Sequence, residues 1–373
     1  MLLKPENQSI YKRQIALLLF LIVPAAKLLL LPTLISYRAK QDSALTVLIG
    51  CAIDFLLLYL VTVAIRIEPE KNLFSILKET FGKLGSQIIM VLLSLYFMMR
   101  AFPVIFEQKG ILTHSLYQNL PFVATIVPYF IVLIYVATKG PRVLGRNADF
   151  FWIVFAIALV VLFFLSVPNG DFTNLLPVLY NGPSPVLEAL YSNLIWFGDF
   201  TMLFCFMGRF APEKKQTFKS LYISAIITSA IVVIFFATFT AVFGETSSKQ
   251  IYALAKMSKY TAFLSNTGRF DWISIFVLLI GIFLNAAVML YAASECIRQA
   301  FGLRNNYLSG FICGGILFVL LALFGQQFPI VYDIYTKYLN YFIIIFQIIL
   351  PLILPLLALR SRRKAKAEKE AAA

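Results

Sequence analysis

The sequence predicts an all-α integral membrane protein with about ten transmembrane helices, arranged as a five-plus-five inverted repeat. The first observation is composition: of 373 residues, 60% are hydrophobic and 13% are charged, whereas a soluble domain has about 45–50% apolar and about 25% charged residues. Mean hydropathy is correspondingly high, at +0.84. The second is a series of long apolar runs, and the third is a helix-breaking residue at matched positions of the two halves.

The apolar runs set the number of helices. Crossing a hydrocarbon core of about 30 Å takes about 20 residues of helix, and ten runs reach or approach that length: 14–36, 43–65, 86–108, 122–138, 148–167, 186–208, 218–243, 271–296, 307–324 and 334–358. We expect one transmembrane domain over 14–358, with repeat one over about 14–167 and repeat two over about 186–358. An N-terminal segment, 1–13, and a basic tail, 359–373, flank it.

Positive charge is distributed unequally between the two sets of loops. With ten spans, 22 of the 32 Lys and Arg residues lie on the side of the termini and eight on the other side. The positive-inside rule therefore places both termini in the cytoplasm. The formal net charge of +14 reflects this topology, so membrane lipid is an expected partner and nucleic acid is not.

Segments one and six contain residues that interrupt helices. In inverted-repeat transporters the first helix of each repeat is broken at mid-membrane, which exposes backbone groups to a ligand. Pro24 removes a backbone hydrogen bond and is expected to bend segment one, while Gly198 fits unwound backbone in segment six. We expect ligand contacts from the residues around these two points: Ala25, Ala26, Lys27, Trp196, Phe197, Gly198 and Asp199.

Four ionisable residues lie near the predicted bilayer centre, namely Lys27, Asp54, Arg100 and Asp199. Charge at that depth costs on the order of 3 kcal/mol per residue and usually holds a polar ligand or passes a proton. A purely structural ion-pair cluster is the alternative. Glu107 repeats the Arg100 helix face nearer the outside, so Asp54, Arg100 and Glu107 are predicted to be supporting charges.

The residues leave the binding chemistry open. Helix-end amides could hold the carboxylate of a zwitterion while Asp199 holds its amine. Lys27 or Arg100 could serve the carboxylate instead. Alternatively, a fixed Lys27 ammonium could take the place of a coupling cation.

Enzyme and metal chemistry have no sequence support. There is no GxSxG, Walker, HExxH or dinucleotide motif, and dispersed cysteines with a lone His114 do not make a metal site. We expect no enzymatic activity, no cofactor and no metal. The stretch from Gly244 to Arg269 has helical spacing among lysines and predicts a helix on the outer surface, as a lid, a partner surface or a connector.

Short motifs over nearly the whole chain carry a family resemblance. They are Leu31-Pro32 followed by Gln41-Asp42, Lys139-Gly140, Asn174-Leu175-Leu176-Pro177, Phe243-Gly244, Arg269 and the stretch Tyr291 to Phe301. In these motifs and in its ten-helix plan the chain resembles the spore germination permeases, the polytopic B subunits of nutrient germinant receptors. That family belongs to the amino acid–polyamine–organocation transporter superfamily, which has the LeuT-like inverted-repeat fold. Lys27, in a segment usually uncharged, and Asp199, in place of a common Glu, depart from the family pattern.

The resemblance implies a function and partners. It implies a germinant-receptor subunit in the inner membrane of the cell or spore that senses a small nutrient, with an amino acid expected, and works with a soluble-domain-bearing A subunit and a lipoprotein C subunit. One alternative is a self-sufficient transporter that moves an amino acid with a proton through Asp199 or Glu107. A second is a ligand-gated ion-conducting subunit whose polar centre lines a pore.

Overall fold

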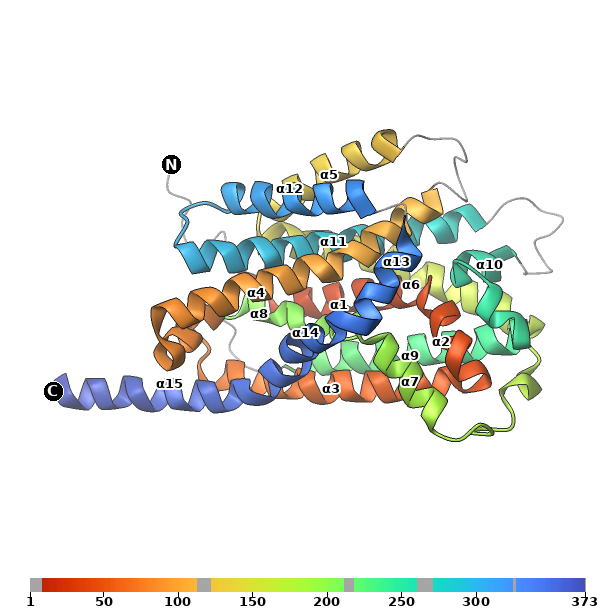
Figure 1. Ribbon diagram of the computed structural model, residues 1–373, viewed down its shortest axis with the longest axis horizontal. Coiled ribbons are helices and arrows are strands. Elements are labelled where there is room, and N and C mark those ends of the chain that lie inside the picture. The colour runs from red at the N-terminus through yellow and green to blue at the C-terminus, as the bar shows by residue number, and fades with distance from the viewer. Residues whose placement is uncertain (1–8, 113–121, 211–217, 260–270, 325–326, 373) are drawn as a thin grey trace.

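The computed structural model describes residues 9–112, 122–210, 218–259, 271–324 and 327–372. This part of the chain is a bundle of helices that mostly follow its long axis (Figure 1), and its only β contact is an isolated bridge between Ile10 and Phe210. The helices are α1 Lys12–Lys27, α2 Leu31–Ala39, α3 Ser43–Ile67, α4 Leu73–Ile111, α5 Phe122–Thr138, α6 Pro141–Ser166, α7 Ser184–Ser192, α8 Leu203–Phe206, α9 Lys219–Phe243, α10 Ala253–Lys259, α11 Asp271–Phe301, α12 Asn306–Phe324, α13 Phe328–Ile334, α14 Asn340–Ile344 and α15 Leu350–Ala372.

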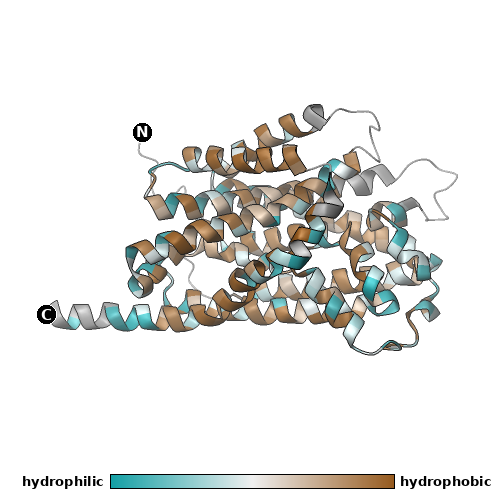
Figure 2. Cartoon of the chain, viewed as in Figure 1, coloured by the Kyte–Doolittle hydropathy of each residue, from teal (hydrophilic) through white to brown (hydrophobic). Residues whose placement is uncertain are grey.

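Seven helical stretches in the described residues are long and apolar enough to cross a membrane. Figure 2 shows hydrophobic residues along the bodies of the helices and hydrophilic residues toward the C-terminal end of α15. The predicted segments not among the seven are the two interrupted ones and the fourth, where α5 contributes a shorter apolar helix. The all-α membrane class is confirmed, and the number ten remains a prediction.

Several helices extend beyond the apolar runs that predicted them. α4 begins at Leu73, where the Asn72 side chain accepts a hydrogen bond from the Ser75 amide and caps the helix start. Its backbone is not helical at Gly82, with φ of 74°, so a short first part precedes a kink and the longer part begins close to the predicted residue 86. α15 continues past 358 through the basic tail. Hydropathy marks only the part of a helix that would sit in hydrocarbon, so a polar extension escapes that signal.

α11 lies at the centre of the bundle. It packs most extensively against α4 and also contacts α1, α5, α6 and α12. The fully buried alanines of its middle, Ala286, Ala287, Ala292 and Ala293, let neighbouring helices approach closely. α1 is enclosed by α6, α9 and α11, so an interruption in its continuation lies inside the bundle.

The stretch after Gly244 contains a helix, α10. Ala253, Leu254, Ala255 and Met257 are buried while Lys256 is exposed, so the helix packs into the end of the bundle, and its place on the outer side of the membrane stays a prediction. His114 and Arg269 lie outside the described residues.

Candidate functional site

Segment one is interrupted between α1 and α2, at Leu28–Leu30. α1 continues through Pro24 to Lys27, so the interruption lies four residues beyond the predicted bend. Pro32 accounts for this position, because it has no N–H to donate to the carbonyl of Leu28, four residues earlier. The carbonyls of Leu28 and Leu29 instead accept hydrogen bonds from the backbone amides of Leu254 and Ala253, at 3.2 and 2.9 Å.

Segment six is interrupted at Phe197 and Gly198, as predicted. Short 3-10 turns, Leu194–Trp196 and Asp199–Met202, stand on either side of the break. Gly198 has a left-handed backbone with φ of 79°, which glycine adopts without steric cost. Its amide donates to both carboxylate oxygens of Asp54, at 2.9 and 3.0 Å. The helix break therefore presents its free amide to a charged side chain of α3.

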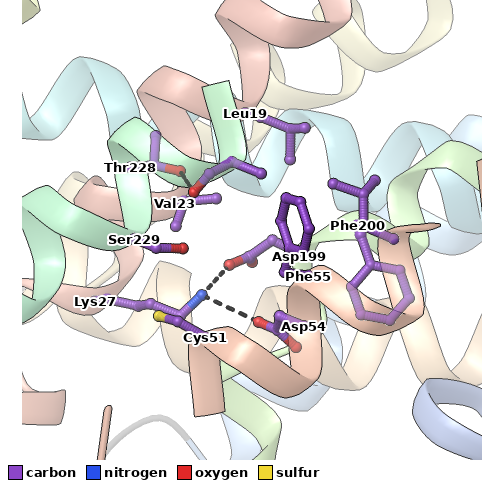
Figure 3. Close-up of a pocket in the computed structure, with 12 residues that line it drawn as sticks. Leu19, Val23, Lys27, Cys51, Asp54, Phe55, Asp199, Phe200, Thr228 and Ser229 are labelled. Atoms are coloured by element: carbon purple, nitrogen blue, oxygen red, sulfur yellow. Dashed lines mark hydrogen bonds and ion pairs between the residues drawn. The ribbon is translucent and has the colours of Figure 1, made fainter. Parts of the chain in front are cut away.

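The four predicted midplane charges form one network near the two breaks. Figure 3 shows three of them, Lys27, Asp54 and Asp199. Lys27 Nζ lies 2.5 Å from Asp199 Oδ2 and 3.7 Å from Asp54 Oδ2. Arg100 Nη2 donates to Asp199 Oδ1 at 2.7 Å. The Lys27, Asp199 and Arg100 side chains are at most 4% exposed, while Asp54 is 17% exposed. Two cations and two anions give a net-neutral cluster, the arrangement in which buried charge is tolerated.

A polar shell around this network was missed by the sequence analysis. Thr201 lies 3.4 Å from the Arg100 guanidinium, Tyr96 OH donates to Gln347 Oε1 at 3.4 Å, and Gln347 Nε2 donates to the carbonyl of Leu194 at 3.0 Å. A signal existed: Tyr96 lies one helical turn before Arg100, and Gln347 is the single polar residue between Tyr341 and Arg360.

A small cavity adjoins the network. Its volume is about 30 Å³, enough for roughly two waters and too little for an amino acid. Lys27, Asp54 and Asp199 line it together with Thr228 and Ser229 of α9 (Figure 3). Apolar residues of α1, α3 and α9 make up most of the remaining wall: Leu19, Val23, Phe55, Leu58 and Ala225. In this conformation the space beside the charged centre therefore has room for water but not for an amino acid.

At the end of the bundle that carries α10, a second set of hydrogen bonds joins the first helix break to its surroundings near Glu107. Glu107 is fully buried, its Oε1 accepts a hydrogen bond from the Leu30 amide at 2.9 Å, and its Oε2 has no hydrogen-bond partner among the described residues. Thr33 Oγ1 donates to the carbonyl of Gln250, just before α10. Glu107 is thus a cap for the first helix break and stands apart from the Lys27 network.

The remaining predicted contact residues differ in their surroundings: one contacts the charged network, and the others are buried elsewhere in the bundle. Phe197 stacks under the Lys27 ammonium, 5.2 Å from its ring centre, and joins the network. Trp196 is buried, with an indole nitrogen that lacks a partner within the described part of the chain. Ala25 and Ala26 are buried, and Ala25 packs close to Gly281 of α11, so it faces the bundle core. A ligand role for any of these residues stays a prediction.

Comparison with known sequences assigns the family. The family model described as "Spore germination protein" matches residues 9–329. The chain belongs to the spore germination protein family. It is 28% identical over 298 residues to spore germination protein KB of Bacillus subtilis (strain 168), covering 77% of each chain. It is 25% identical over 344 residues to spore germination protein A2 of the same organism, covering 90% of this chain and 92% of the relative. The predicted resemblance is confirmed.

The fold of this spore germination protein is also that of solved transporters. A nucleobase–cation symport family transporter, in a closed conformation with bromovinylhydantoin bound, superposes with a TM-score of 0.62 at 14% identity, covering 93% of this chain and 78% of that one. A Na⁺-coupled sialic acid symporter, in a substrate-bound outward-open state, gives 0.59 at 12% identity, covering 92% and 80%. At this identity the likeness establishes the inverted-repeat fold alone.

Proposed function

We propose that this protein is the permease-like, ligand-binding subunit of a nutrient germinant receptor, and that its germinant is a small amino acid captured where segments one and six are unwound. The observation that carries the proposal is the meeting of both helix breaks at one net-neutral set of charges. By family resemblance, the subunit acts in the spore inner membrane with a soluble-domain-bearing A subunit and a lipoprotein C subunit.

Charge balance supports a zwitterion as the ligand. Lys27, Arg100, Asp54 and Asp199 already neutralise one another, so a ligand of net charge would leave one group uncompensated in a buried site, which is costly. An amino acid brings one charge of each sign. Its amine can replace Lys27 at a carboxylate while its own carboxylate engages the released ammonium, and the sum stays zero.

A self-sufficient amino acid–proton transporter is the second candidate. It is favoured by the fold shared with transporters and by the cavity that reaches Asp54, the most exposed member of the network. A carboxylate with access to water at one end and contact with both helix breaks is suited to carry a proton.

Proteoliposomes containing the purified chain separate the two candidates. A labelled amino-acid mixture is offered with and without a pH gradient, and thermal stability of the detergent-solubilised chain is measured with the same mixture. Ligand-dependent stabilisation without accumulation supports the receptor subunit, and saturable, gradient-driven accumulation supports the transporter. The variant Asp199→Asn should abolish either response, and an unchanged dose–response in that variant would refute the assigned site. Conductance without uptake would favour an ion-conducting subunit.

A further inference from the structure

The last membrane segment contacts segment six near its break through three polar side chains that are not among the four charged residues of the network. Gln347 Nε2 donates to the Leu194 carbonyl at 3.0 Å, and Asn340 Nδ2 donates to the Tyr191 carbonyl at 2.8 Å. Tyr332 OH donates to the Asn193 side-chain oxygen at 3.1 Å. Side chains of this one segment therefore occupy acceptors at the end of α7 and in the unwound stretch that follows it.

Gln347 lies directly against the break itself. It is 2% exposed, and a Cβ added to Gly198 would lie 2.5 Å from the Gln347 carboxamide carbon. The Gly198 amide donates to Asp54, and the Leu194 carbonyl accepts from both Gln347 and the Phe197 amide. These polar backbone groups, which a broken helix could offer to a ligand, are thus bonded within the chain itself in this conformation.

The helix that carries these residues has an unusual backbone. Two π-helical turns, Tyr335–Leu339 and Ile345–Ile349, interrupt it, and Gln347 lies within the second. Two α turns span about 7.2 residues and a π turn adds one, which brings Tyr332 and Asn340, eight residues apart, onto the same face. Converting a π turn into an α turn would rotate the helix beyond it by about 100°.

We propose that Gln347 is a positioning residue that occupies the ligand's place at the segment-six break and couples ligand capture to movement of the last membrane segment. A ligand that binds the Leu194 carbonyl displaces the Gln347 carboxamide, and the segment then rotates or swings at its π turns. The inference rests on the proposed function for the identity of the ligand. The contact of Gln347 with the segment-six break, which we call the latch, is present in the chain without ligand.

Spin labels on two exposed positions test the latch. Cysteines introduced at Leu187 of α7, 56% exposed, and at Tyr338, 70% exposed, report the distance between segment six and the last segment, while the four native cysteines are buried. We expect Gln347→Met to shift the ligand-free distance distribution part of the way, by about fivefold in the population ratio, toward the distribution that an amino-acid mixture produces in the unsubstituted chain. Ile345→Met, at a 47% exposed position of the same π turn, is the matched control and should change nothing.

The dose–response distinguishes a latch from a structural contact. Loss of about one net hydrogen bond should lower the half-maximal amino-acid concentration about fivefold in Gln347→Met, equivalent to about 1 kcal/mol, with an unchanged maximal response. A destabilised protein would instead lose response and thermal stability together. Identical ligand-free distributions in Gln347→Met and the unsubstituted chain would overturn the latch. Absence of any amino-acid response in the unsubstituted chain, with the ligand-free shift present in Gln347→Met, would overturn the proposed function and leave the latch intact.

Discussion

Charge balance at the midplane can be tested with a double-mutant cycle on Lys27 and Asp199. Asp199→Asn leaves two buried cations, Lys27 and Arg100, with Asp54 as the single counter-ion, so the cluster carries a net charge of about +1. Lys27→Met leaves a net negative cluster instead. Removing one partner of a buried pair costs about 3–5 kcal/mol. The double variant is neutral again, so its loss should fall short of the sum of the single losses by about 1–3 kcal/mol.

A thiol-reactive dye provides the assay, because all four cysteines are buried in the folded chain and become reactive on unfolding. Each single variant should lower Tm by an amount on the order of 5–10 °C, and the double variant should recover part of that loss. Arg13→Gln is the control: Arg13 is 75% exposed and pairs with Asp149, which keeps its hydrogen bond from Gln14, and such surface pairs contribute about 0–1 kcal/mol. Additive losses in the cycle would show that Lys27 and Asp199 do not act as a pair and would refute the network.

Two further substitutions test the helix breaks. Gly198→Ala should abolish ligand response and destabilise the fold by more than about 1–2 kcal/mol, because it combines a positive φ with a Cβ that meets Gln347. The control, Gly302→Ala, lies at a positive φ with open space around it and should cost only the backbone strain. Equal losses of Tm in the two variants would contradict this reasoning. Glu107→Gln keeps an acceptor for the Leu30 amide and should be tolerated, whereas Glu107→Met leaves that amide unsatisfied at about 1–3 kcal/mol; equal melting curves for the two would exclude the capping role.

The sequence predicted that the four charged residues lie at one level of the bundle, where the structure brings them into contact, but not which of them pair. For a charge inside an apolar run, the sequence gives its position along the helix. That position was enough to predict a common level for Lys27, Asp54, Arg100 and Asp199. Rotation about each helix axis is fixed by packing, which the sequence does not display. Glu107 illustrates the limit, since its spacing from Arg100 gave the correct face while its actual neighbour, the Leu30 amide, exists only because segment one is broken.

The position of the first break shows a second limit. Both Pro24 and Pro32 remove a backbone donor, and local sequence gives no reason to prefer one of them. Tertiary contacts supply the reason: the carbonyls freed near Pro32 meet the amides of Leu254 and Ala253. These residues lie more than 200 positions away in the sequence, so no local pattern could have indicated them.

The direct ion pair between the two breaks has a consequence for any movement of the bundle. Lys27 belongs to the end of α1, and Asp199 begins the 3-10 turn after the second break. Separating these segments exposes two charges that are now almost completely buried, and each needs a new partner. A zwitterion supplies both partners at once, whereas water or a single ion replaces them less completely in a narrow cavity. The ligand-free chain is therefore expected to remain closed, and ligand capture lowers the barrier by exchanging partners rather than by breaking the pair.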